Sequence, residues 1–180
     1  MTPREQEEYA ALRATIRERG TTRPWVALCG FVSWAALTAA TAALAFPPVA
    51  SILPLFVLAA AFECVFALHI GVERVGRYLQ VFYEDQWERA AMEFGRPKGS
   101  VGLDPLFLIP FLVAALINTM PALIQSPTTQ ELVFIAGAHA LFVVRLVAAR
   151  GASLKQRAIE LRRFEEIKIP GTIPPSHDFH

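Results

Sequence analysis

The stretch WVALCGFVSWAALTAATAALAFPPVASILPLFVLAAAFECVFALHI, residues 25–70, consists of two apolar runs joined by a Pro-Pro pair. Glu63 is the only Asp, Glu, Lys or Arg in it. Each run has the length of about 20 residues that an α-helix needs to cross the roughly 30 Å hydrocarbon core of a bilayer. The stretch therefore predicts a transmembrane helical hairpin, with spans at Trp25–Phe46 and Val49–Ile70.

A second apolar pair follows at Pro105–Ile124 and Leu132–Ala149, again with a short connection between its members. The chain has 180 residues, of which 54% are hydrophobic, and its mean hydropathy is +0.39. Ala43-Leu44-Ala45 resembles a signal-peptide cleavage site, but 24 residues that include four glutamates precede the first run. Because signal peptides begin with a short basic segment, we expect no cleavage there.

The basic residues predict the orientation. Of the 17 Lys and Arg residues, five lie between residues 4 and 23, five between 74 and 98, and seven between 145 and 168. The two short connections inside the hairpins contain none. Since Lys and Arg accumulate in cytoplasmic segments, we predict an all-α, four-helix membrane bundle of two in-out-in hairpins with both termini in the cytoplasm. The Ala- and Arg-rich composition without an organelle signal favours a bacterial cytoplasmic (inner) membrane.

Helical patterns continue into the predicted cytoplasmic segments. Thr2 and Glu5 have the spacing of a capping box, and Gly20 is typical of a helix end, which predicts a separate N-terminal helix. The second span is expected to continue as one helix as far as Phe94, and Pro170 to end the last helix. The predicted segments are 1–23 (amphipathic helix), 24–70 (first hairpin), 71–104 (cytoplasmic helix and loop), 105–149 (second hairpin) and 150–180 (basic helix and Pro-rich tail).

A possible internal repeat relates the two hairpins. An offset of 76 residues places Glu63 on His139 and His69 on Arg145. Both spans run in the same predicted direction, so Glu63 and His139 are expected near the middle of the bilayer. His69 and Arg145 then lie about 9 Å nearer the cytoplasm at helical rise.

Charged groups near the bilayer centre are costly and are usually paired or functional. We expect Glu63 to pair with His139 in an intramembrane polar cluster that also includes Asn118 and Arg145. The pair would act as a structural lock or as a proton relay. Alternatively, a neutral Glu63 bonds to Asn118 or to a hydroxyl group of the first span. The secondary candidates are His69 and Glu73, which are one helical turn apart.

Few features point to a cofactor or to catalysis. The two cysteines, Cys29 and Cys64, lie within spans, where we expect them to pack as small apolar side chains without a disulfide. A b-type haem between His69 and His139 is disfavoured by their difference in depth. No phosphate-binding glycine loop, HExxH or CxxC motif is present. We therefore predict no catalytic residue, metal site, cofactor or nucleic-acid partner, and expect the protein not to be an enzyme.

Three functions remain as expectations. The first is a non-catalytic accessory or assembly subunit of a membrane complex, because small residues in the first span allow close helix contacts. Its partners would be the lipid bilayer and either other membrane subunits or further copies of the chain. The second is a small proton- or ion-coupled transporter or oligomeric channel that uses Glu63 and His139. The third is a b-type haem electron-transfer protein.

Overall fold

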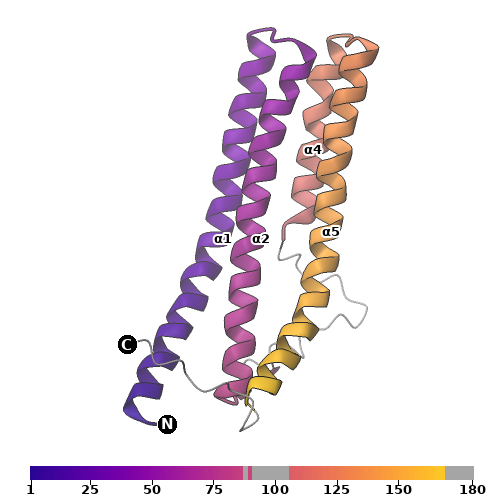
Figure 1. Cartoon of the computed structure of the whole chain (residues 1–180). Coiled ribbons are helices and arrows are strands. Elements are labelled where there is room, and N and C mark those ends of the chain that lie inside the picture. The colour runs from indigo at the N-terminus through magenta and orange to yellow at the C-terminus, as the bar shows by residue number, and fades with distance from the viewer. Residues whose placement is uncertain (87–88, 91–105, 169–180) are drawn as a thin grey trace, which may run out of the picture. The chain divides into compact units, whose positions relative to one another are not determined.

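The computed structural model describes residues 1–86, 89–90 and 106–168 (Figure 1). Within this part of the chain the regular structure is entirely helical, as predicted. The elements are α1 (Pro3–Ala43), a short 3-10 helix η1 (Pro48–Ser51), α2 (Ile52–Phe82), α4 (Leu108–Ile124) and α5 (Thr129–Lys168).

Three of the helical segments, α1, Pro48–Phe82 and α5, are long and apolar enough to cross a membrane. The fourth, α4, is apolar but has only 17 residues. It begins at Leu108, three residues after the predicted start of its span. These helices suggest a membrane protein.

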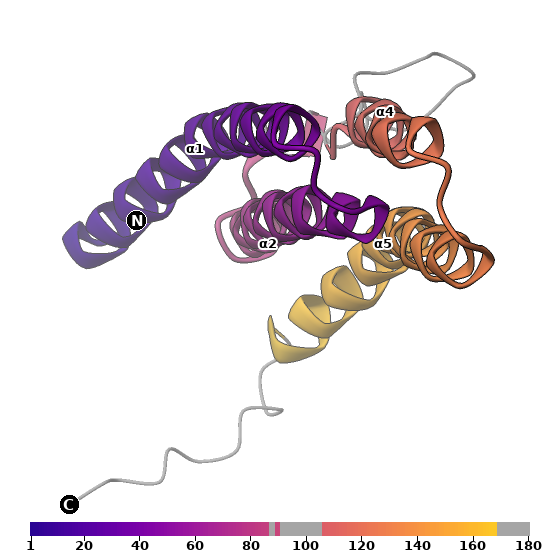
Figure 2. The same ribbon diagram turned by 90° about the horizontal axis from the view of Figure 1, so that it is seen from above.

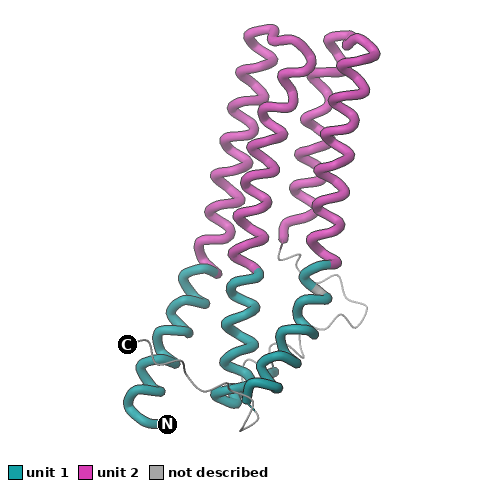
Figure 3. Tube along the Cα trace, viewed as in Figure 1, with its two compact units in different colours: residues 1–19, 70–103, 152–180 teal, residues 20–69, 104–151 magenta. Residues whose placement is uncertain are grey.

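The chain divides into two compact units (Figure 3). Unit 1 comprises residues 1–19, 70–103 and 152–180, and unit 2 comprises residues 20–69 and 104–151. In unit 2 the helical segments are arranged around a shared core in the order α1, α2, α5, α4 (Figure 2).

In the core of unit 2, aromatic rings from all four helices contact one another. Phe62 of α2 is fully buried. Its ring makes edge-on contacts with Phe111 of α4, at a centroid distance of 5.4 Å, and with Phe142 of α5, at 6.4 Å. Phe31 of α1 lies 4.8 Å from Phe111. Edge-on and tilted ring pairs at these distances are favourable, so the four rings join the helices at one level.

Helices α1 and α2 approach closely at Gly30. A Cβ atom added at this position would overlap the Cβ of Ala61. Ala27, one turn earlier, is also buried. The small residues of the first span therefore serve, at least at these positions, as a packing surface within the chain, because small side chains let helix backbones come together.

The predicted capping box of α1 is present. The backbone N–H of Thr2 donates to Glu5 Oε2 (2.6 Å), and the N–H of Glu5 donates to Thr2 Oγ1 (3.3 Å). The predicted helix end at Gly20 is wrong, because α1 continues through Gly20 and Pro24. Pro24 removes only the N–H that would bond to the Gly20 carbonyl. The long apolar segment beyond it keeps the rest of its helical bonds.

The prediction of a single helix from the second span to Phe94 is also wrong, because α2 ends at Phe82. Glu84 has a left-handed backbone with φ of 53°. The N–H groups of Tyr83 and Asp85 both donate to the Leu79 carbonyl, as at a helix C-terminus. A glutamate is rarely found in this conformation, so no sequence signal marks the end. The expected end near Phe94 and the expected effect of Pro170 lie outside the described residues.

Candidate functional site

Asn118 of α4 is fully buried in unit 2 and joins α4 to three other elements. Its amide nitrogen donates to the Ser51 carbonyl (2.8 Å) and to His139 Nε2 (3.1 Å). Its oxygen accepts from Trp34 Nε1 (3.1 Å) and, at the limit of a hydrogen bond, from Thr38 Oγ1 (3.5 Å). An asparagine side chain offers two donors and two acceptor sites. All four are used here.

His139 of α5 is buried beside Asn118. Its Nδ1 lies 2.8 Å from the Ile135 carbonyl. A carbonyl only accepts, so we assign the proton to Nδ1, and Nε2 then accepts from Asn118. The assigned state is a neutral imidazole with both nitrogens engaged. Binding of a metal or haem iron through Nε2 would require breaking the bond to Asn118.

Glu63 is paired with Arg145, not with His139 as expected. Arg145 Nη2 donates to Glu63 Oε2 at 2.7 Å. The side chains are 48% exposed for Glu63 and 40% for Arg145. The guanidinium group also lies over the ring of Phe66, 5.0 Å from its centroid. The predicted cluster therefore separates into a buried pair, Asn118 with His139, and an exposed ion pair.

A water-sized space of about 10 Å³ lies beside Asn118 at the end of unit 2 that carries the two short connections. It is lined by residues of α1, η1, α2, α4 and both connections. The buried hydroxyl oxygen of Ser51 is one of its lining groups and has no hydrogen-bond partner among the described residues. A single ordered water would satisfy this oxygen.

His69, a secondary candidate, is buried near the other end of unit 2. Its Nδ1 lies 3.2 Å from Arg23 Nη1. A guanidinium group only donates, so Nδ1 is the acceptor in this contact. The expected pairing of His69 with Glu73 stays a prediction.

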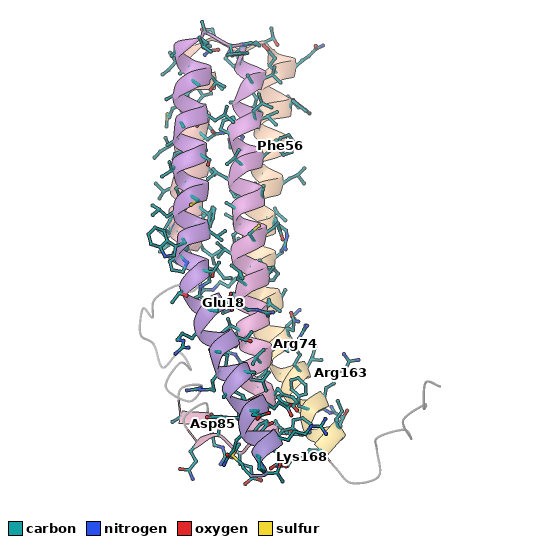
Figure 4. The ribbon with its side chains drawn as sticks, turned by 90° about the vertical axis from the view of Figure 1, so that its left-hand side faces the viewer. Glu18, Phe56, Arg74, Asp85, Arg163 and Lys168 are labelled. Carbon is teal, nitrogen blue, oxygen red and sulfur yellow. The ribbon has the colours of Figure 1, made fainter. Side chains whose placement is uncertain are left out.

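Glu73, the other secondary candidate, belongs to an ion cluster in unit 1. The central residue is Arg77 of α2, whose side chain is only 1% exposed and donates to Glu73 (3.0 Å) and to Glu160 of α5. Arg157 also donates to Glu73 (3.0 Å), and Arg74, labelled in Figure 4, donates to Glu160 (2.8 Å). Burial of a charge is costly unless the charge is paired, and the buried Arg77 is paired with two carboxylates. The cluster therefore locks the unit 1 segments of α2 and α5 together.

The cluster also determines the pKa of Glu160. Burial alone would raise this pKa, but hydrogen bonds from Arg74, Arg77 and Gln156 outweigh burial and lower it. Elsewhere in unit 1, burial and a hydrogen bond to Glu8 raise the pKa of Tyr78 to about 12. The Tyr78 hydroxyl donates to the Glu8 carboxylate at 3.0 Å, which joins α2 to α1.

Sequence reasoning missed some partners of the buried polar groups. Trp34 and the Ser51 carbonyl were not expected to bind Asn118, although the indole N–H of a tryptophan inside an apolar run needs an acceptor. The contact of Arg77 with Glu73 agrees with their i, i+4 spacing on one helix. The burial of Arg77 depends on α5, which lies far away in the sequence, and no local pattern reports such a contact.

The described residues contain no group of three or more His, Cys, Asp or Glu side chains placed to hold a metal ion. Both cysteines, Cys29 and Cys64, are free thiols on exposed helix surfaces. We expected both cysteines to pack as small apolar side chains, and this stays a prediction; within one copy of the chain they are exposed and form no disulfide. Compared with protein-family models, curated proteins and solved structures, this chain gives no match.

Proposed function

We propose that the protein is an integral protein of the bacterial cytoplasmic membrane and acts as a non-catalytic assembly or accessory subunit. The observation that supports this function best is the exposed Glu63–Arg145 ion pair on two helices that are apolar enough to span a bilayer. A single charged side chain at the centre of a membrane helix costs about 2.5–3.5 kcal/mol on insertion scales. Contact within the pair offsets part of this cost, and cover by another protein surface would offset more.

The buried polar groups support a structural role for the interior. Asn118 uses all its hydrogen-bonding positions to join α4 to the other elements of unit 2, and His139 uses both its nitrogens. Hydrogen bonds of this kind hold membrane helices together, at about 0.6 kcal/mol each on average. In this proposal the interior stabilises the bundle, and the exterior pair contacts partners.

The distribution of Lys and Arg places both termini in the cytoplasm in this proposal. A reporter fused to the C-terminus and active only on the cytoplasmic side tests this orientation. Activity on the opposite side would reverse it.

The function is tested by purification into lipid nanodiscs directly from the native membrane, followed by measurement of particle mass. We expect the wild-type chain in particles heavier than one copy, and a large loss of these particles when Glu63→Gln and Arg145→Gln are combined. The matched control neutralises Arg162 and Glu166, an exposed ion pair of α5 in unit 1 with an N–O distance of 3.0 Å. Wild-type particles at the mass of a single copy would contradict the proposal.

Proton- or ion-coupled transport is the competing function, and the same preparations test it in liposomes. We expect no pH-dependent ion flux from either the wild type or Glu63→Gln. A flux through the wild type that Glu63→Gln abolishes would replace the proposed function with transport.

A further inference from the structure

We infer that the surface around Glu63 and Arg145 binds a second copy of the same chain, so that the two copies form a symmetric dimer within the membrane. This inference rests on the proposed function and names the partner. In the dimer, Arg145 of each copy faces Glu63 of the other, and the two ion pairs join into a ring of four alternating charges.

The first argument is charge complementarity. The exposed pair consists of one acid and one base in direct contact, 2.7 Å apart, and therefore at the same depth. Two copies inserted in the same orientation are related by an axis along the membrane normal, which preserves depth. A two-fold interface is self-complementary, because residue i meets residue j and j meets i. A second copy thus supplies the required opposite charges at the required level, whereas any other partner would need its own matching pair.

The second argument is the unused bonding capacity of the pair. An arginine has five N–H donors, and a carboxylate has two acceptor oxygens. Among the described residues, Nη2 is the only guanidinium nitrogen of Arg145 with a hydrogen-bond partner, and Glu63 Oε1 has none. Phe66 covers one face of the guanidinium group. The remaining donors and the free oxygen can therefore bind the equivalent groups of a second copy.

The third argument is the surface around the pair, which we call the α2/α5 face. Its residues follow each other at alternating steps of three and four along α2, and at steps of seven, four and three along one side of α5. This is the spacing of helices that pack side by side with a left-handed crossing. Ala60, Ala67 and Ala148 are small enough for close approach. Phe56, labelled in Figure 4, is 66% exposed. The face contains the half-buried Arg145 and the exposed residues Leu53, Phe56, Ala60, Glu63, Ala67, Phe134, Leu141 and Ala148.

The natural cysteines allow a direct test in native membranes. Cys64 is exposed next to Glu63, whereas Cys29 is exposed on α1, outside the α2/α5 face. A Cys29→Ser variant, treated with a short bis-maleimide, should give a cross-linked product at twice the 19.9 kDa mass of the chain. The matched control, Cys64→Ser, retains only the thiol on α1 and should give little of this product.

Complementary charge variants separate contacts between copies from contacts within one copy. Glu63→Arg gives a chain with two basic residues at the site, and Arg145→Glu gives a chain with two acidic residues. Each alone should reduce the Cys64 product more than about tenfold, because like charges meet across the interface. When the two variants carry different tags and are expressed together, a mixed dimer should reappear. The internal pair is broken in both chains, so only pairing between copies explains the recovery.

The outcomes distinguish the dimer from the proposed function. A mixed dimer together with the Cys64 product supports the inference. A Cys64 thiol that reacts only with other membrane proteins overturns the dimer and leaves the assembly function intact. No cross-link at all, with single-copy mass in nanodiscs, overturns both. If a charge variant does not accumulate in the membrane, the Cys29→Ser chain, which retains Glu63 and Arg145, tests the dimer by its Cys64 cross-link alone.

Discussion

Replacement of Asn118 by leucine tests whether the buried hydrogen-bond network holds the bundle together. Leucine has a similar volume, so the change leaves little cavity and mainly removes hydrogen bonds. It leaves three groups without their partner: the Trp34 indole N–H, the Ser51 carbonyl and His139 Nε2. The contact to Thr38, at 3.5 Å, is too long to contribute much.

The expected loss follows from these three bonds. Hydrogen bonds between membrane helices contribute about 0.6 kcal/mol on average and at most about 1.7 kcal/mol. Loss of three of them should lower the free energy of unfolding by about 2–4 kcal/mol. The measurement is reversible unfolding in mixed micelles, titrated with SDS and followed by far-ultraviolet circular dichroism.

The neighbouring residue provides the matched control. The hydroxyl of Thr119 donates to the Leu116 carbonyl of its own helix, at 2.7 Å. Thr119→Val should therefore change the free energy of unfolding by less than about 0.5 kcal/mol. An Asn118→Leu variant as stable as this control would refute the reasoning, because the network would then hold nothing together.

Three further predictions concern other contacts. Gly30→Val should destabilise unit 2 by about 1–3 kcal/mol because the new side chain overlaps Ala61. A second change, Ala61→Gly, should recover part of this loss. If Gly30→Val left the midpoint of the SDS titration unchanged, the close approach of the two helices would be contradicted. Arg77→Met should lower the free energy of unfolding by about 1–3 kcal/mol in the same titration. Glu73 and Glu160 lose a buried partner, but each retains another guanidinium group. A more stable variant would show that the cost of burying the charge exceeds the energy of its ion pairs. Folding lowers the pKa of Glu160 below its ordinary 4.5, so its ion pairs should stabilise unit 1 fully above about pH 4.5 and lose this contribution as the pH falls through the lowered value. Spin labels on α2 and α5 in unit 1 should then move apart in acid, and a distance that is constant from neutral pH to acid would contradict this prediction.

The positions of the helices could largely be predicted from the sequence. The length and apolar composition of a run are local properties, and the capping box at Thr2 and Glu5 is a local pattern. The helix ends inside the amphipathic segments could not be predicted in this way. At Gly20 the favourable helix on both sides overrides a residue that usually ends helices, and at Glu84 the chain adopts a left-handed conformation without a glycine.

The buried partners of the polar residues depend on tertiary contacts. Asn118 was expected among the intramembrane polar groups because an amide inside an apolar run needs partners. Those partners come from α1, η1 and α5, and the order of helices around the core decides which of them are within reach. Neither hydropathy nor spacing within one helix contains this order.

The exchange of partners between Glu63 and His139 has two geometric causes. Glu63 contacts Arg145, six residues along α5 from His139, so Glu63 and His139 differ in depth by about 9 Å and are not level as expected. The 76-residue offset compares depth along the helix axis, but each residue also turns about that axis by about 100°. His139 and Arg145 are six residues apart and therefore point about 120° away from each other. With His139 buried against Asn118, Arg145 must lie toward the exterior, where Glu63 is exposed.

The structure thus separates two roles, that of the internal network around Asn118 and that of the external pair of Glu63 with Arg145. Variants of Asn118 should therefore lower the free energy of unfolding of each copy without selectively weakening association between folded copies. Variants of Glu63 and Arg145 should do the reverse, since an exposed ion pair contributes only about 0–1 kcal/mol to the stability of one copy. Measurement of both quantities for both sets of variants tests this separation. If variants of Glu63 and Arg145 lowered the free energy of unfolding and did not weaken association, the exterior pair would hold the bundle together and partners would bind elsewhere.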